Sequence, residues 1–176
     1  MSGRARLIAR VAVFAALIYV FSWATSFLPN VNLAYFIAFG GGFLWGAVPG
    51  MLVGGFGILL WSTFNPYGPA ALPVTMAQVV GMAVCGLLGA LFRPWLPPGM
   101  ASPRRFLVAG AAALAVTAVY VLPVNLVDAW LFQPFWPRFI TGLAWSLPTL
   151  LSNTLIFALL LPVLHRIYER EAGKPC

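Results

Sequence analysis

Long apolar runs fill most of the chain, and polar positions are confined to short stretches between them. Most of these runs approach the roughly 20 residues that a helix needs to cross the hydrocarbon core of a membrane. The pattern therefore predicts an all-α membrane protein instead of a water-soluble fold. Six membrane-spanning helices are expected, over residues 7–28, 32–46, 50–63, 74–92, 106–127 and 139–165.

The Gly-rich stretch between Asn32 and Ser62 admits one span or two. A continuous helix over this stretch would be about 45 Å long, well beyond the roughly 30 Å of the hydrocarbon core. The stretch also contains Pro49, and proline breaks the interior of a helix. We therefore expect two short spans, joined by a turn near residues 46–50.

Composition agrees with a lipid environment. Hydrophobic residues make up 62% of the chain and charged residues 7%, which lies outside the range of soluble globular domains. A chain this small leaves much of its surface exposed, and only membrane lipid tolerates an apolar surface of that extent. We expect one transmembrane domain over residues 1–176. The two cysteines, Cys85 and Cys176, indicate neither a disulfide framework nor a metal site.

The basic residues lie beside the apolar runs. Six spans would place nine of them on one side of the membrane and only Arg138 on the other. The nine are Arg4, Arg6, Arg10, Arg93, Arg104, Arg105, Arg166, Arg170 and Lys174. The positive-inside rule puts this side in the cytoplasm, so both termini are expected there, in a protein of the plasma membrane. Because the charges flank the spans and form no patch, no nucleic-acid partner is expected.

Apart from Arg10, near the start of the first span, the expected spans hold no Asp, Glu, Lys or Arg. Ion-coupled carriers place ionisable groups at depth, so an autonomous carrier of that kind is not expected. An enzyme is not expected either, because the one histidine, His165, lies at the end of a span and no metal-ligand or nucleophile spacing occurs. No cofactor and no metal are predicted.

Uncharged polar and aromatic residues gather toward the outer ends of the spans. Amides both donate and accept hydrogen bonds, and aromatic rings add flat apolar faces, so together they suit a small, heterocyclic, largely neutral solute. Singly, each residue also fits an aromatic belt or a link between helices. For the cluster as a whole we favour a binding site, formed by Asn30, Asn32, Asn65, Tyr67, Gln78, Asn125, Asp128, Trp130, Trp145 and Asn153.

The connection from Asn65 to Pro73 contains three prolines and one glycine, Gly68. Proline restricts the backbone angle φ, whereas glycine adopts a wide range of backbone conformations. We therefore expect a stiff loop with one mobile joint at Gly68 and no helix. Such a loop fits a lid over the site and fits an ordinary connector equally well.

Small residues recur every three or four positions in three places. The rows are Gly42, Gly46, Gly50 and Gly54; Ala77, Gly81, Cys85 and Gly89; and Ala5, Ala9, Ala12 and Ala16. Such rows let helices approach closely in lipid. A peripheral first helix needs no such face unless something packs on it, and Ala9, Ala12 and Ala16 are the candidate positions for contact with a partner protein.

The chain resembles the S-components, the substrate-binding membrane subunits of energy-coupling factor vitamin transporters. The resemblance rests on six spans, the pattern of residues 12–16, the Gly-rich segment 40–57, and Asn65-Pro66-Tyr67-Gly68-Pro69 followed by Gln78 and Gly81. It implies a vitamin bound near the outer face, under the connections between spans 1 and 2 and between spans 3 and 4. It also implies that Ala12 and Ala16 pack on a transmembrane partner subunit.

The resemblance further implies that two separate ATPase subunits supply the energy for transport, and the chain has no Gly-x-x-x-x-Gly-Lys phosphate loop of its own. The pocket residues match no single vitamin's pattern, so the solute stays open. The alternative hypothesis is a structural or assembly membrane protein, whose small-residue rows bind other helices and whose outer loops bind no small molecule.

Overall fold

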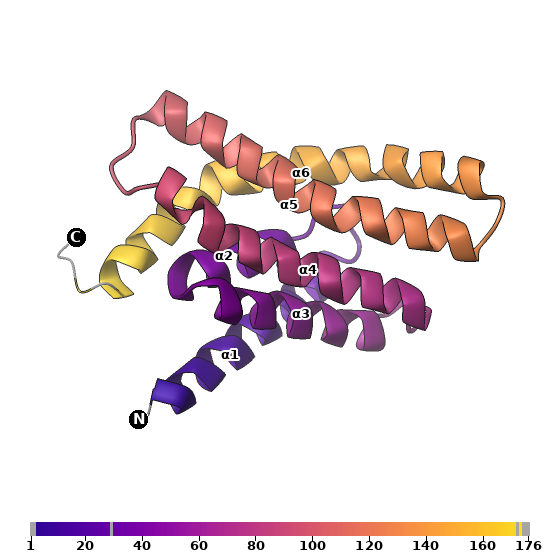
Figure 1. Cartoon of the computed structure of the whole chain (residues 1–176), viewed down its shortest axis with the longest axis horizontal. Helices are drawn as coiled ribbons and strands as arrows, with labels where there is room; N and C mark the ends of the chain where they lie inside the picture. The colour runs from indigo at the N-terminus through magenta and orange to yellow at the C-terminus, as the bar shows by residue number, and fades with distance from the viewer. Residues whose placement is uncertain (1–2, 29, 172, 174–176) are drawn as a thin grey trace.

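The computed structural model describes residues 3–28, 30–171 and 173, and in these residues it contains helices and no strand (Figure 1). The helices are α1 (Gly3–Ala24), α2 (Ala34–Trp45), α3 (Ala47–Phe64), α4 (Leu72–Phe92), α5 (Ser102–Leu131) and α6 (Phe135–Glu171), with a short 3-10 helix, η1 (Arg93–Trp95), after α4. The prediction of an all-α protein is therefore confirmed.

Five of these helices are long and apolar enough to cross a membrane, namely all but α2. Such a set indicates a multi-pass membrane protein. The remaining helix, α2, has 12 residues, and at about 18 Å it is too short to cross the hydrocarbon core by itself. The structure thus gives five helices of spanning length, where six spans were expected.

The break between α2 and α3 is narrower than the turn expected near residues 46–50. It is confined to Gly46, whose φ of 98° lies in a region that glycine adopts without strain. Helix α3 begins at the next residue, so Pro49 falls in its first turn. The backbone N–H groups of a first turn have no partner within the helix, so proline costs no hydrogen bond there. This is why α3 reaches 18 residues.

Helix α2 lies at the centre of the bundle and contacts α1, α3, α4 and α6. All of its residues except Ile37 and Trp45 are buried. Its aromatic side chains pack edge to face on α6, with the ring centroids of Phe39 and Phe157 5.0 Å apart. A helix that is apolar on every side needs such a buried position, and α2 therefore forms the core.

Glycines let α2, α3 and α4 pack backbone against backbone. A Cβ added to Gly50 would lie 2.5 Å from Cα of Gly42, and one added to Gly54 would lie 2.2 Å from the carbonyl oxygen of Met82. A Cβ on Gly86, which belongs to none of the three predicted rows, would lie 2.0 Å from the carbonyl oxygen of Gly50. The close packing predicted from the small residues is confirmed for these helices.

Both ends of the chain lie at the same end of the bundle (Figure 1). Arg10 near the start of α1 forms an ion pair with Glu171 at the end of α6. Arg93, at the end of α4, donates a hydrogen bond to the carbonyl oxygen of Gly42 at 3.0 Å. We call this the basic end, because it carries Arg4, Arg6, Arg10, Arg93, Arg104, Arg105, Arg166 and Arg170. Lys174 and Cys176 lie outside the described residues.

Candidate functional site

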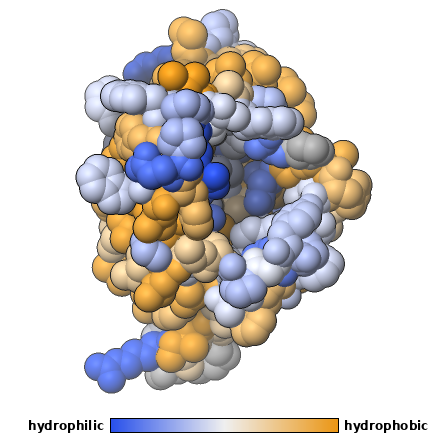
Figure 2. Space-filling view, turned by 90° about the vertical axis from the view of Figure 1, so that its right-hand side faces the viewer, coloured by the Kyte–Doolittle hydropathy of each residue, from blue (hydrophilic) through white to orange (hydrophobic). Residues whose placement is uncertain are grey.

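A pocket of about 330 Å³ opens at the end of the bundle opposite the basic end. Its walls come from the end of α1, the connection between α1 and α2, the start of α2, the end of α3, the loop between α3 and α4, and α6. Figure 2 looks at this end and shows hydrophilic residues gathered around a hollow. The lining residues are Ser22, Thr25, Ser26, Leu28, Asn30, Val31, Asn32, Tyr35, Trp61, Tyr67, Trp145 and Thr149.

Asn30 ties the connection between α1 and α2 to α6. Its φ is 62°, in the left-handed region that asparagine tolerates better than most residues. Its side-chain Oδ1 accepts a hydrogen bond from the hydroxyl of Thr149 at 3.1 Å, and its backbone carbonyl accepts one from Ser152 at 2.8 Å. The connection is thereby fastened across the mouth of the bundle.

Asn32 orders the start of α2. Its Oδ1 accepts a hydrogen bond from the backbone N–H of Ala34 at 2.8 Å, which satisfies one of the orphan N–H groups at this helix end. The same side chain lies 3.2 Å from the hydroxyl of Ser22 on α1. Asn32 therefore joins the end of α1 to the start of α2 on one wall of the pocket.

The loop between α3 and α4 is held by Asn65 and forms another wall. The amide of Asn65 donates to the carbonyl of Gly68 at 2.8 Å and accepts from the N–H of Tyr67 at 2.9 Å. Gly68 has a φ of 92°, so the loop requires glycine there. The hydroxyl of Tyr67 donates to the carbonyl of Ser26 at 2.6 Å, which joins this loop to the end of α1. As predicted, residues 65–71 form no helix, but α4 begins at Leu72 and so includes the last two residues of the expected connection.

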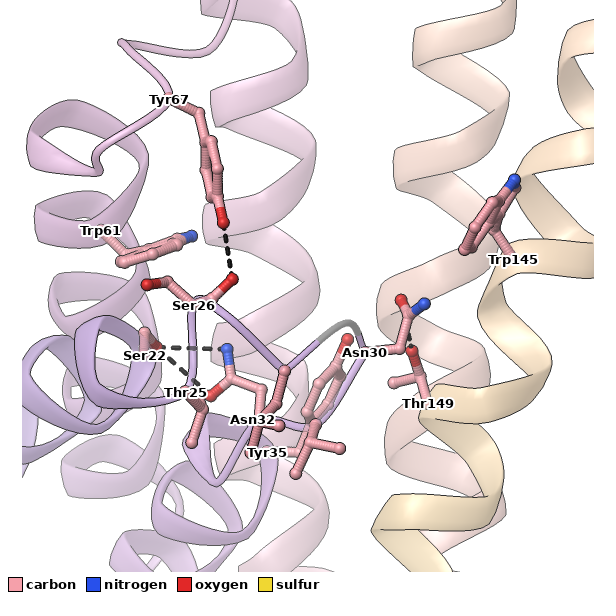
Figure 3. A pocket seen from close by; sticks show the side chains of 12 residues that line it. Ser22, Thr25, Ser26, Asn30, Asn32, Tyr35, Trp61, Tyr67, Trp145 and Thr149 are labelled. Atoms are coloured by element: carbon pink, nitrogen blue, oxygen red, sulfur yellow. Dashed lines mark hydrogen bonds between the residues drawn. The ribbon is translucent and has the colours of Figure 1, made fainter.

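Aromatic rings stand on opposite sides of the pocket (Figure 3). Trp61 of α3 and Tyr67 lie on one side with the polar residues of α1, while Trp145 faces them from α6. Tyr35 of α2 rises between the two sides and contacts Tyr120 of α5, with ring centroids 5.2 Å apart. The pocket thus offers flat faces to a ring and polar groups to its edge.

No charged side chain lines the pocket. Asp128 of α5 does not line the pocket. It forms an ion pair with Arg138 of α6 at 2.5 Å, which joins the ends of the two helices. Among the residues that the structure describes, no group of three or more His, Cys, Asp or Glu could hold a metal ion. The chemistry of the lining is therefore that of uncharged hydrogen bonds and aromatic contact.

The structure brings four of the ten predicted site residues together in the pocket: Asn30, Asn32, Tyr67 and Trp145. Asn65 supports the lining from within the loop. Gln78 of α4 accepts a hydrogen bond from Ser62 of α3 at 2.6 Å and does not line the pocket. The remaining four lie elsewhere on α5 and α6, where they are Asn125, Asp128, Trp130 and Asn153.

Two of these outlying amides link α5 to α6. Asn125 donates to the hydroxyl of Ser146 at 3.2 Å, and Asn153 donates to the hydroxyl of Thr117 at 2.9 Å. Asn153 is fully buried, and its Oδ1 has no hydrogen-bond partner among the described residues. Trp130, in contrast, is 74% exposed near the tip of α5.

Sequence analysis missed eight lining residues: Ser22, Thr25, Ser26, Leu28, Val31, Tyr35, Trp61 and Thr149. The hydroxyls of Ser22, Thr25 and Ser26 recur at spacings of one to four residues at the end of the first span, and this was the available signal. Tyr35 and Trp61 carried none, because an aromatic residue inside an apolar run is equally typical of packing in the core.

Larger grooves on the bundle differ in chemistry. The groove between α1 and α3 has a volume of about 470 Å³, and its lining side chains, which include Leu7, Val11 and Phe56, are all apolar. Lipid acyl chains suit such a surface in a membrane protein. The 330 Å³ pocket is therefore the better candidate for a polar solute, although it is smaller.

Comparison with protein-family models, curated proteins and solved structures finds no match for this chain. Its function must therefore be argued from the pocket and from the arrangement of the helices. The arrangement allows non-covalent capture of a small solute at one end of a membrane bundle.

Proposed function

We propose that this chain is the solute-capturing subunit of an importer of the energy-coupling factor type. It binds a small, vitamin-like or heterocyclic solute at the outer face of the plasma membrane and delivers it inward with an ATPase-driven partner module. The observation that carries the proposal is the uncharged pocket lined by amides, hydroxyls and aromatic rings at the end opposite the basic end.

The charge distribution supports an orientation in which the pocket lies at the outer face of the membrane. The positive-inside rule assigns the basic end to the cytoplasm, together with both termini. The pocket then faces outward, where a capture subunit meets its solute. In this orientation α2 and α3 together act as the second and third of six spans, with the short α2 enclosed by its neighbours.

The partner module is supported by two features of the chain. Its described helices carry no ionisable group suited to coupling an ion at depth, so energy must come from elsewhere. Ala9, Ala12 and Ala16 are all exposed on α1, where a transmembrane partner subunit can pack closely. Two ATPase subunits then act through that partner, and this chain catalyses no reaction itself.

Affinity purification from native membranes tests the proposal. The wild-type chain should bring down a transmembrane subunit and two ATPase subunits, and at least one vitamin of a broad panel should raise its unfolding temperature. Ala12→Phe should reduce the recovery of these subunits, because it adds bulk to the exposed face of α1. The control is Val13→Phe, at the neighbouring position, which is 57% exposed and lies outside the alanine row.

Two outcomes would contradict the proposal. Purification without ATPase subunits, combined with no stabilisation by any vitamin, would favour the structural or assembly protein instead. Labelling of Tyr67→Cys only from the cytoplasmic side, in intact cells compared with inverted vesicles, would refute the orientation.

A further inference from the structure

An apolar groove of about 430 Å³ lies between α4 and α5, beside the basic end. The two helices run side by side, and the connection between them lies at that end (Figure 1). The groove is open to the surroundings, because Leu91 and Leu107 on its two walls are 56% and 76% exposed. All of its lining side chains are aliphatic or aromatic, so it suits an acyl chain of the bilayer.

Arg104 supplies a positive charge at the end of this groove. Residues three and four positions apart share a face of a helix, so Arg104 lies on the face of Leu107, Val108 and Ala111, which line the groove. Helical side chains lean toward the N-terminus, so the guanidinium extends past the groove toward the polar edge of the membrane. Arg104 is exposed and forms no ion pair with any described residue.

Trp95 supplies a hydrogen-bond donor at the same end. It belongs to η1, directly after α4, and it lines the groove. The residue is 63% exposed, and its indole N–H makes no hydrogen bond within the described part of the chain. Tryptophan favours the membrane–water interface, where its ring lies among acyl chains and its N–H reaches the headgroups.

No acidic side chain lines the groove or pairs with Arg104 among the described residues. The whole chain contains three acidic residues. Asp128 pairs with Arg138 at the far end of α5, whereas Glu169 and Glu171 lie on α6, where Glu171 pairs with Arg10. The polar end of the groove is therefore positively charged and favours an acidic headgroup over a zwitterionic one.

The groove between α1 and α3 resembles this groove only in part. Arg4 lies one turn before Leu7 and Ile8, which line it, but no tryptophan does. Its lining also includes Ala12, which belongs to the face of α1 that the proposed function assigns to a partner subunit. An unpaired cation and a tryptophan N–H occur together only at the groove between α4 and α5, among the described grooves.

We propose that the groove between α4 and α5 binds one acidic phospholipid from the leaflet at the basic end. The upper part of one acyl chain packs between the two helices, and Arg104 and the N–H of Trp95 donate hydrogen bonds to the lipid phosphate. The proposal goes beyond the proposed function and does not rest on it, because it requires only a bilayer around the bundle.

Native mass spectrometry of the purified full-length protein tests the proposal. The probes are phosphatidylglycerol and phosphatidylcholine with the same palmitoyl and oleoyl chains, titrated into the detergent-solubilised protein. The wild type should bind the first phosphatidylglycerol molecule about fivefold more tightly than the first phosphatidylcholine molecule, the contribution of one basic side chain at an acidic headgroup.

Two variants separate the charge from the groove. Arg104→Gln should abolish the preference for phosphatidylglycerol, whereas Arg6→Gln, an exposed arginine of α1 at the same end, should retain it. Ala111→Phe should weaken the binding of both lipids, because its ring fills the groove, and the exposed position tolerates the larger side chain. Leu122→Phe, 49% exposed on α5 outside the groove, should change neither affinity.

Equal affinity of the wild type for the two lipids would overturn the proposal. Equal losses in Arg104→Gln and Arg6→Gln would also overturn it, because charge anywhere on the basic end would then suffice. Unchanged lipid binding by Ala111→Phe would show that the acyl chain lies elsewhere, and loss of a co-purifying protein from this variant would make the groove a protein interface instead. The proposed function has separate readouts, namely solute binding and recovery of the ATPase subunits, which Arg104→Gln should leave unchanged.

Discussion

Adding one methyl group at Gly54 should separate α3 from α4. The Cβ of Gly54→Ala would lie 2.2 Å from the carbonyl oxygen of Met82 and 2.8 Å from its carbon, whereas ordinary contact begins at 3.4 Å. The helices must therefore move apart by about 1 Å, because the obstacle is backbone and cannot rotate away. Overpacking of this kind lowers the free energy of unfolding by about 1–3 kcal/mol, and occasionally by more.

The neighbouring residue Gly55 provides a matched control. A Cβ there would meet only side-chain atoms of α4, at 3.8 Å and beyond. Both variants gain the same roughly 0.5–1 kcal/mol from alanine's better helix propensity, so this term cancels in the comparison. For a chain of this size we expect Gly54→Ala to unfold roughly 2–12 °C below Gly55→Ala.

Thermal unfolding of the purified proteins, followed by tryptophan fluorescence, measures this difference. Gly55→Ala should unfold at or slightly above the wild-type temperature. Equal unfolding temperatures for the two variants would refute the close approach of α3 and α4, and with it the account of how the glycines hold the core together.

Three further predictions concern single contacts. Tyr67→Phe should speed amide hydrogen exchange around Ser26, because the 2.6 Å hydrogen bond between the two loops is lost. The loss should cost about 0.5–1.5 kcal/mol, and unchanged exchange would contradict this hydrogen bond. Gly46→Ala should lower the free energy of unfolding by about 1–3 kcal/mol, because alanine is strained at the φ of 98° that residue 46 adopts. A smaller loss in thermal unfolding would show that the backbone between α2 and α3 can adopt another conformation. Arg10→Gln should cost at most about 1 kcal/mol, an effect abolished at high salt, since its pair with Glu171 is partly exposed; a salt-independent loss would contradict a surface ion pair.

The helices could be predicted because lipid imposes one simple requirement on the chain. A run of apolar residues long enough to cross the membrane has to pair its backbone groups within itself, and a helix does so. Outside the hydrocarbon core, backbone groups can form hydrogen bonds with water. The requirement therefore does not determine the residue at which each helix ends. Helix α6 extends from Phe135 to Glu171, beyond the expected 139–165, because helices can continue into the polar regions on either side.

Three of the four predicted lining residues lie in connections, and the fourth, Trp145, lies inside α6, whereas the other predicted residues inside helices lie outside the pocket. Asn30, Asn32 and Tyr67 could be identified because uncharged polar and aromatic residues gather at the outer ends of the spans. Gln78 and Asn125 were chosen on the same chemistry, and the structure places them in hydrogen bonds between helices. Which amide faces a cavity and which faces a neighbouring helix depends on helix rotation, and a run of apolar residues does not encode that rotation.

The central claim is that the pocket captures a small molecule, and mass spectrometry of the purified protein tests it most directly. The decisive comparison is between the wild-type chain, Trp145→Ala in the pocket and Trp136→Ala outside it, since both tryptophans lie on α6 and are 63% and 67% exposed. We predict that one low-mass ring compound accompanies the wild type and Trp136→Ala and is largely lost from Trp145→Ala. Absence of any bound solute, or equal amounts in all three proteins, would contradict the account.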